Sequence, residues 1–257
     1  MLRFIFSIGL SIFAMSSHCW AADEATVAAA SDLKFALPAV AKAFEAQSGK
    51  TVKLTFGSSG QFATQIANGA PFEVFLSADE QLIDKLNAAG LLRDAGQLYA
   101  LGKLSVFAPE GSAVTCDADL AGLEAALASG KAGKIAIANP EHAPYGRAAK
   151  TALDTAGLWV QAQPLLVLGE SATQALQFAT SGGASAALVP APLVEAPEFK
   201  EKGCHVRISD KLAVPLRQRL GVIKTAGQTA IGFAAFITSE KGRAILANYG
   251  FSFPSVP

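Results

Sequence analysis

The chain lacks an excess of charge of either sign. Its 257 residues include 21 Lys and Arg and 21 Asp and Glu, so the formal net charge at neutral pH is +0. Partners that are polyanions, such as nucleic acid or an anionic membrane surface, favour proteins with a basic excess. The composition therefore argues against both kinds of partner.

Histidine and cysteine are also scarce. Beyond residue 21 the chain contains only His142 and His205, and no cluster of Cys, His and carboxylates has the spacing of a zinc site. A serine hydrolase needs a base beside its nucleophile, and the candidate nucleophile Ser59 lies outside any Gly-x-Ser-x-Gly motif. An exported serine hydrolase is therefore the disfavoured alternative, and we expect a protein that is not an enzyme.

No segment beyond the N-terminal region has the length of about 20 uncharged apolar residues that a transmembrane helix needs. Within that region Arg3 precedes an apolar run over residues 4–15, and Cys19-Trp20-Ala21 places small residues where a signal peptidase reads them. The pattern predicts a signal peptide over 1–21 that is cleaved after Ala21, with an uncleaved anchor as the alternative. We expect a soluble protein of the periplasm with 20 basic and 21 acidic side chains.

Two cysteines remain in the predicted mature chain, Cys116 and Cys204. An even number of cysteines in an oxidising compartment is compatible with a disulfide. The sequence does not show that their Cα atoms lie close enough to be bonded, so a disulfide and two free thiols both stay open.

β-like and helical patterns alternate along the mature chain and predict two α/β lobes, each with a mainly parallel sheet flanked by helices. We place the lobes at residues 22–102, 103–214 and 215–257, with the first and last segments forming one lobe. Ligands of such folds bind in the cleft that the carboxyl ends of the strands face. The predicted strands cover residues 52–56, 74–76, 104–108, 135–138, 165–168, 186–189, 206–208 and 220–223, and the predicted helices cover residues 34–44, 61–67, 80–89, 120–129, 147–155, 173–180, 230–237 and 241–248.

Two short runs of small and hydroxyl residues follow β-like segments in the first lobe. They are Ala28-Ala29-Ala30-Ser31-Asp32 and Gly57-Ser58-Ser59-Gly60, and each leads into a helical pattern. The first turn of a helix offers free backbone N–H groups and the positive end of the helix dipole, which together attract anions. Since neither run contains Lys or Arg, we expect a small enclosed anion held by neutral donors.

Two strand-to-helix turns of the second lobe are suited to the same role. Residues 138–146 carry Tyr145 in a loop restricted by two prolines, and residues 169–174 offer backbone N–H groups near Ala172. Each of these residues also has an ordinary structural explanation, because Ser is a common helix cap and Tyr a common turn residue.

Five motifs in order carry a resemblance to a known family. They are Ala-Ala-Ala-Ser-Asp at 28–32, Gly-Ser-Ser-Gly at 57–60, Asn-Gly-Ala-Pro-Phe-Glu-Val-Phe-Leu-Ser-Ala-Asp at 68–79, Ala-Asn-Pro-Glu-His-Ala-Pro-Tyr-Gly at 138–146 and Asn-Tyr-Gly-Phe at 248–251. The chain resembles the periplasmic molybdate-binding proteins of ABC uptake systems over essentially its whole mature length. The resemblance implies a two-lobed type II periplasmic-binding fold that captures molybdate or tungstate in the interlobe cleft and delivers it to the membrane subunits of a permease. It also implies a monomer without a cofactor.

The resemblance implies which residues contact the anion. Ser31 and Ser59 match two hydroxyl donors of the first lobe, and Ala172 matches a backbone amide donor of the second. Asp32 stands where some relatives have Asn, and only its backbone amide is expected to help, because a carboxylate repels a dianion. Pro190 replaces a tyrosine ligand of other members, so we expect Tyr145 to supply the missing hydroxyl.

A cavity lined only by donors selects an oxyanion that carries no proton. Molybdate, tungstate and sulfate meet that condition, whereas a lining carbonyl or carboxylate would favour protonated phosphate. Sulfate differs from the other two in size, which the sequence does not define. A binding protein for another tetrahedral oxyanion such as sulfate therefore stays open as an alternative.

Overall fold

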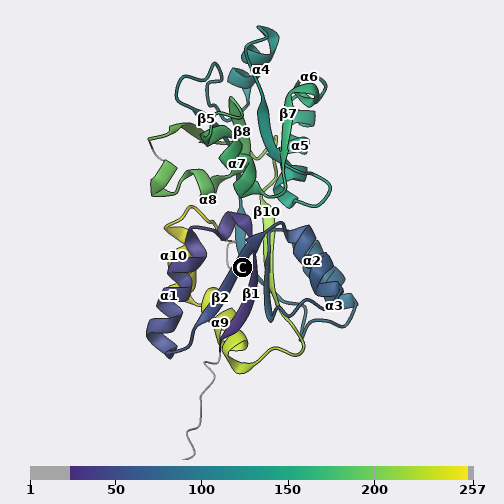
Figure 1. Ribbon diagram of the computed structural model, residues 1–257, viewed down its shortest axis with the longest axis vertical. Coiled ribbons are helices and arrows are strands. Elements are labelled where there is room, and N and C mark those ends of the chain that lie inside the picture. Colours follow the sequence, from purple (N-terminus) through teal and green to yellow (C-terminus); the bar gives the residue numbers. More distant parts are fainter. Residues whose placement is uncertain (1–23, 200, 254–257) are drawn as a thin grey trace, which may run out of the picture.

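The computed structural model describes residues 24–199 and 201–253, and the predicted signal peptide with its cleavage site lies outside them. Two lobes lie one above the other along the longest axis of the molecule (Figure 1). The purple, blue and yellow lobe, lobe I, holds both ends of the described chain, and the teal and green lobe, lobe II, holds its middle. Each lobe is built around one sheet, as predicted, and each of the two sheets has five strands.

The sheet of lobe I has the order β2-β1-β3-β10-β4. Strands β1, β2 and β3 are parallel neighbours, and β10 pairs antiparallel with both β3 and β4. Four strands therefore run one way, and β10, which enters from lobe II, runs the other way. The bounds are β1 (Ala25–Ala30), β2 (Val52–Gly57), β3 (Val74–Ser77), β4 (Gln97–Gly102) and β10 (Leu216–Val222).

The sheet of lobe II repeats this topology with the order β7-β6-β8-β5-β9. Strands β6, β7 and β8 are parallel, and β5, which enters from lobe I, pairs antiparallel with β8 and β9. The bounds are β5 (Leu104–Pro109), β6 (Ile135–Ala138), β7 (Leu166–Gly169), β8 (Ala186–Pro190) and β9 (Gly203–Arg207).

Helices cover the faces of the lobe I sheet. The helix expected over 34–44 begins at Ala36, which puts Pro38 in its first turn, where a missing N–H costs no hydrogen bond and causes no kink. The chain leaves this helix through Gly49, whose φ of 71° suits glycine. The helices of this lobe are α1 (Ala36–Ser48), α2 (Ser59–Ala67), α3 (Glu80–Ala88), α9 (Gln228–Thr238) and α10 (Glu240–Ala247), with the short 3-10 helix η1 (Ser31–Leu33) directly after β1.

The second lobe differs from expectation at one helix that concerns the cleft. Helix α5 starts at Pro144 rather than near Arg147, so Tyr145 lies in the first helical turn and not at a loop tip. Proline suits the first helical position because its φ is already helical and its missing N–H has no partner there. The helices of lobe II are α4 (Ala121–Ala128), α5 (Pro144–Thr155), α6 (Trp159–Ala162), α7 (Ala172–Thr180) and α8 (Ala191–Val194), with 3-10 helices η2 (Gln163–Leu165) and η3 (Pro197–Phe199).

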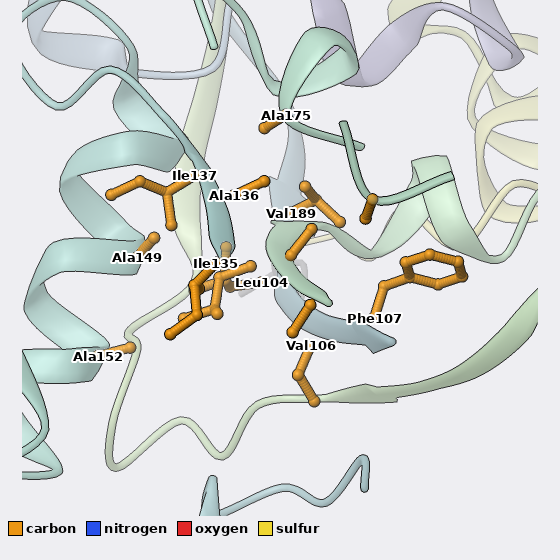
Figure 2. Packing of buried hydrophobic residues seen from close by; sticks show 14 of the residues in the cluster. Leu104, Val106, Phe107, Ile135, Ala136, Ile137, Ala149, Ala152, Ala175 and Val189 are labelled. Carbon is orange, nitrogen blue, oxygen red and sulfur yellow. The ribbon is translucent and has the colours of Figure 1, made fainter. Parts of the chain in front are cut away.

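Each sheet has an apolar core on both of its faces. In lobe II, Ile135 and Ile137 of β6 face helix α5, where Ala149 and Ala152 present small side chains (Figure 2). Alternate residues of a strand point to opposite faces, and so Ala136 faces the α7 side of the sheet. Because both faces are filled, the strands cannot slip in register, and their carboxyl ends stay in place at the cleft.

Two segments cross between the lobes, one from β4 to β5 through Lys103 and one from β9 to β10. The Lys103 ammonium lies 2.9 Å from a carboxylate oxygen of Asp210 and so ties the two crossovers together. We keep the division at residues 22–102, 103–214 and 215–257 as a proposal. None of the described helices has both the length and the apolar character needed to cross a bilayer.

A disulfide joins Cys116 to Cys204 in lobe II. The two Cα atoms are 5.9 Å apart and 88 positions apart in the sequence. The bond fastens the segment after β5 to the start of edge strand β9. Of the two states that the sequence left open, the structure contains the disulfide.

Candidate functional site

The two hydroxyl motifs of lobe I meet because their strands are neighbours. Ala30, the last residue of β1, pairs with Gly57, the last residue of β2. Ser31 follows the first strand and Ser58 follows the second, so both lie at the same edge of the sheet. The site therefore begins where parallel strands end and helices start, as the sequence predicts.

Ser58 is the N-cap of α2 and Ser59 its first helical residue, two positions earlier than expected. The Ser59 hydroxyl oxygen accepts a hydrogen bond of 3.0 Å from the backbone N–H of Ala78, which follows β3. A hydroxyl has a single hydrogen, and with its oxygen engaged as an acceptor that hydrogen stays available to donate into the space beside it. Ser59 is 2% exposed, so the available donor is shielded from bulk water.

Lobe II contributes the first turns of two helices. Pro144 and Tyr145 open α5, and Ala172 opens α7 after the N-cap Ser171, whose hydroxyl oxygen accepts from the Gln174 N–H. The unpaired N–H groups and the positive dipole ends of these helices lie opposite those of α2.

All five residues expected at the site line one small interlobe cavity of about 10 Å³, which is about the space of one water molecule. Among the described residues around it there is no Lys, Arg or His, and Asp32 and Tyr145 are the members with an ionisable side chain. The donors that this lining can offer are therefore neutral ones, namely hydroxyl groups and backbone N–H groups. Its lining consists of Ala30, Ser31, Asp32, Gly57, Ser58, Ser59, Ala78, Ala143, Pro144, Tyr145 and Ala172.

Asp32, Tyr145 and Gln218 form a buried hydrogen-bond triangle at the wall of the cavity. Oδ2 of Asp32 accepts from Gln218 Nε2 at 2.6 Å and from the Tyr145 hydroxyl at 3.1 Å, and the same Nε2 is 2.9 Å from the tyrosine oxygen. The triangle joins η1 of lobe I, α5 of lobe II and strand β10. A Cβ at Gly102 would lie 2.0 Å from the tyrosine oxygen, so the β4 backbone packs directly against it.

Burial controls the ionisation of this triangle. It raises the pKa of Asp32 from 3.8 to about 6, although hydrogen bonds from Gln218, Tyr145 and the backbone partly oppose the shift. Burial, followed by the nearby charge of Asp32, raises the pKa of Tyr145 well above its usual range. The tyrosine is therefore neutral at physiological pH, and the carboxyl is the group that titrates.

Two features of the site differ from what the sequence predicts. Tyr145 was expected to donate its hydroxyl hydrogen to the anion, and here the hydroxyl donates to Asp32. Gln218 was not expected at the site. A sequence signal for it does exist, because Gln218 is the buried position between Arg217 and Arg219 on a strand, where an apolar residue is the rule.

A second group of contacts joins the lobes beside the cavity. The backbone carbonyl of His142 accepts from the Ser58 hydroxyl at 2.7 Å and from the Gly60 N–H at 3.0 Å. The His142 ring has Nδ1 at 3.0 Å from Ser58 Oγ and Nε2 at 3.2 Å from the carboxylate of Glu170. Gln61 donates to the same carboxylate at 2.8 Å.

Ser58, His142 and Glu170 superficially resemble the triad of a hydrolase. A carbonyl oxygen only accepts, so the single hydrogen of the Ser58 hydroxyl goes to the His142 carbonyl, and Nδ1 must then be the donor to Ser58 Oγ. A base would need the opposite arrangement. The candidate nucleophile Ser59 instead accepts from the backbone of Ala78. The geometry is that of an interlobe contact.

Further interlobe bonds surround the cavity. Thr173 of α7 donates to the Ser31 carbonyl at 3.1 Å, and Arg147 of α5 pairs with Asp79 at 2.6 Å. With these contacts made, the lobes are in a closed arrangement. No three Cys, His, Asp or Glu side chains within residues 24–199 and 201–253 are gathered as ligands of a bare metal ion.

Comparisons with known proteins find similar sequences and a similar solved fold. A family model for the bacterial extracellular solute-binding proteins matches residues 25–252. The chain is 33% identical to the molybdate-binding protein ModA of Rhodobacter capsulatus, over 90% of this chain and 89% of the relative, and 32% identical to ModA of Azotobacter vinelandii, over 97% and 96%. The solved structure of the periplasmic molybdate-binding protein of Azotobacter vinelandii superimposes with a TM-score of 0.81 at 30% identity, covering 90% of this chain and all of that one.

Proposed function

This chain belongs to the family of bacterial extracellular solute-binding proteins, and we propose that it captures molybdate or tungstate between its lobes and delivers it to an ABC permease. The observation that carries the proposal is the closed interlobe cavity. It is lined by serines and helix N-termini and, in the part of the chain that the structure describes, by no cationic side chain. The two ModA relatives described above are molybdate-binding proteins, and the matches cover 90% and 97% of this chain.

The site residues have different roles in this proposal. Ser31 and Ser59 donate from lobe I, Ala172 donates its backbone N–H from α7, and Tyr145 and Asp32 complete the wall. The serine hydroxyls and backbone N–H groups suit a dianion that carries no proton, and Asp32 is the one acidic side chain among the lining residues. Since the cavity of the closed form is small, the anion enters while the lobes are apart and closure follows.

The family membership also supports a proposal for delivery and location. The solved relative is a periplasmic protein, and we propose the periplasm for this chain, with the signal peptide removed after Ala21. The membrane subunits of the permease are the transient partner, and the binding protein acts as a monomer without a cofactor. We propose stoichiometric capture rather than turnover, because the two ModA relatives are binding proteins and the Ser58 hydroxyl donates to the His142 carbonyl.

Isothermal calorimetry with molybdate, tungstate, sulfate and phosphate in turn tests the proposal. Molybdate and tungstate are expected to bind one per chain and much more tightly than the other two. Sulfate binding more tightly than both would replace the proposed ligand by the smaller anion. Heat that continues at a steady rate after saturation would indicate turnover and contradict a binding protein.

A further inference from the structure

We propose that Asp32 acts as a proton-carrying donor of the anion site, so that each dianion is captured together with one proton from solvent. This inference rests on the function proposed above and adds a residue role to it. The proton lies on Oδ1 of Asp32, and the carboxylic acid group presents a donor where a carboxylate would present a negative charge.

The hydrogen bonds of Asp32 separate its two oxygens. Oδ2 accepts from both Gln218 and Tyr145, whereas Oδ1 is buried and has no hydrogen-bond partner among the described residues. A buried carboxylate oxygen without a partner is costly, and a proton on it removes the charge while the two bonds to Oδ2 persist. Oδ1 is therefore the oxygen that takes the proton.

Asp32 also lies at the cavity proposed to hold the anion. Asp32 is 1% exposed and lines the same cavity as Ser31 and Ser59. Two negative charges a few ångströms apart in a site without water repel each other strongly. A bound dianion therefore favours the protonated acid, and binding and proton uptake are coupled.

No positively charged group among the described residues faces Asp32 to stabilise its carboxylate and so weaken the coupling. Tyr145 from α5 and Tyr99 from β4 are the titratable groups that face it, and burial raises the pKa of both, so both are neutral. Helices α7 and α8, which pack against η1, contain no ionisable residue. Lys53 of β2 is exposed and lies four residues before Gly57, and the neighbouring Lys34 is exposed. No described cation is placed to hold the carboxylate charged.

The pKa of the anion-free protein sets the pH at which coupling begins. Burial raises the pKa of Asp32 to about 6, and a nearby dianion raises it further. Above about pH 6 the free protein must take up a proton to bind, so the apparent Kd should rise about tenfold per pH unit. Below that pH the proton is already present, and Kd should be constant.

Calorimetry with molybdate in two buffers of different ionisation enthalpy measures the protons taken up. At about pH 8 we expect close to one proton per anion for the wild type and none for Asp32→Asn, whose amide keeps a donor without a charge. Asp32→Asn should bind with a pH-independent Kd and about a hundredfold more tightly than the wild type at that pH, which lies two units above the Asp32 pKa.

A second measurement does not depend on the variant. The carboxyl carbon resonance of Asp32 in the wild type should titrate near pH 6 without anion and stay in its protonated position beyond pH 8 with molybdate. Molybdate binding with no proton uptake and an unchanged Kd across this range would overturn the inference but leave the proposed function intact. If neither the wild type nor Asp32→Asn bound molybdate, tungstate or sulfate at any pH, the proposed function would be overturned and the inference with it.

Discussion

The hydroxyl of Ser58 donates to the backbone carbonyl of His142 at 2.7 Å, so a serine of lobe I holds a loop of lobe II. The N–H of Gly60 donates to the same carbonyl at 3.0 Å. One carbonyl of lobe II thus receives two hydrogen bonds from the first turn of α2, directly beside the cavity. The fit is tight, because a Cβ on Gly60 would lie only 2.2 Å from that oxygen.

Gly60→Ala should therefore weaken anion binding, because the added methyl group opposes closure of the two lobes. The methyl group meets the His142 carbonyl only when the lobes are closed, whereas alanine is well tolerated within a helix. We expect the Kd for molybdate to rise tenfold or more, about 1.4 kcal/mol, with little change in the melting temperature of the anion-free protein. Gly232→Ala is the matched control, because a Cβ there meets only ring atoms of Phe44 at 3.8 Å. An unchanged Kd for Gly60→Ala would show that this contact is not needed for capture.

Ser59→Ala should weaken anion binding and also lower the stability of lobe I, because the buried N–H of Ala78 loses its acceptor. The Ser59 hydroxyl is buried and oriented by the Ala78 N–H, so its loss leaves an oxygen of the anion unpaired and costs about 1–3 kcal/mol of binding free energy. Calorimetry with molybdate measures the cost. Ser129→Ala, an exposed serine at the end of α4, is the control and should bind like the wild type. Equal losses in the two variants would contradict the role given to Ser59.

The stability of the anion-free protein should fall as the pH rises through the titration of Asp32. The pKa of about 6 in the folded state lies above the ordinary aspartate value of 3.8, so the folded state binds more protons than the unfolded state between these values. The contribution of Asp32 to the free energy of unfolding is at most about 3 kcal/mol. It is fully present below about pH 4 and is lost above about pH 6. Denaturant unfolding of the wild type and Asp32→Asn should show stabilities that diverge across that window. Parallel pH profiles would indicate that Asp32 titrates normally.

Reduction of the disulfide should lower stability but leave the anion affinity unchanged. The bond between Cys116 and Cys204 closes a long loop in lobe II, and loss of such a bond costs about 2–5 kcal/mol, largely through the unfolded chain. Neither cysteine is among the residues that line the interlobe cavity. The double variant Cys116→Ala/Cys204→Ala should melt at lower temperature and bind molybdate with the wild-type Kd. A weaker Kd would mean that the disulfide also positions the site.

Molybdate should raise the melting temperature of the wild type. A ligand that binds only the folded state stabilises it by an amount set by its concentration relative to Kd, about 2.7 kcal/mol at a hundredfold excess over Kd. Tungstate should act in the same way, and sulfate at the same concentration should have little effect. A large shift with sulfate alone would favour the alternative ligand.

Local patterns in the sequence predicted much of this fold. The strands that end just before Ser31 and Ser58 could be identified because hydroxyl residues and glycine are common where a strand ends and a helix starts. Strand β4 (Gln97–Gly102) was missed, since it is an edge strand that depends on pairing with β10, more than a hundred residues later. Helix α5 began earlier than predicted, because Pro144 occupies its first position.

The sequence by itself determined that two α/β lobes would bring serines and helix N-termini toward one cleft, because strand ends and helix caps depend on residues close together in the chain. Only the tertiary structure decided that Gln218, from β10, joins Asp32 and Tyr145, and that Ser58 rather than Ser59 contacts His142. These contacts span 186 and 84 positions. No local pattern specifies such pairs, since they depend on how two sheets and their crossovers pack, and on the burial that shifts the Asp32 pKa.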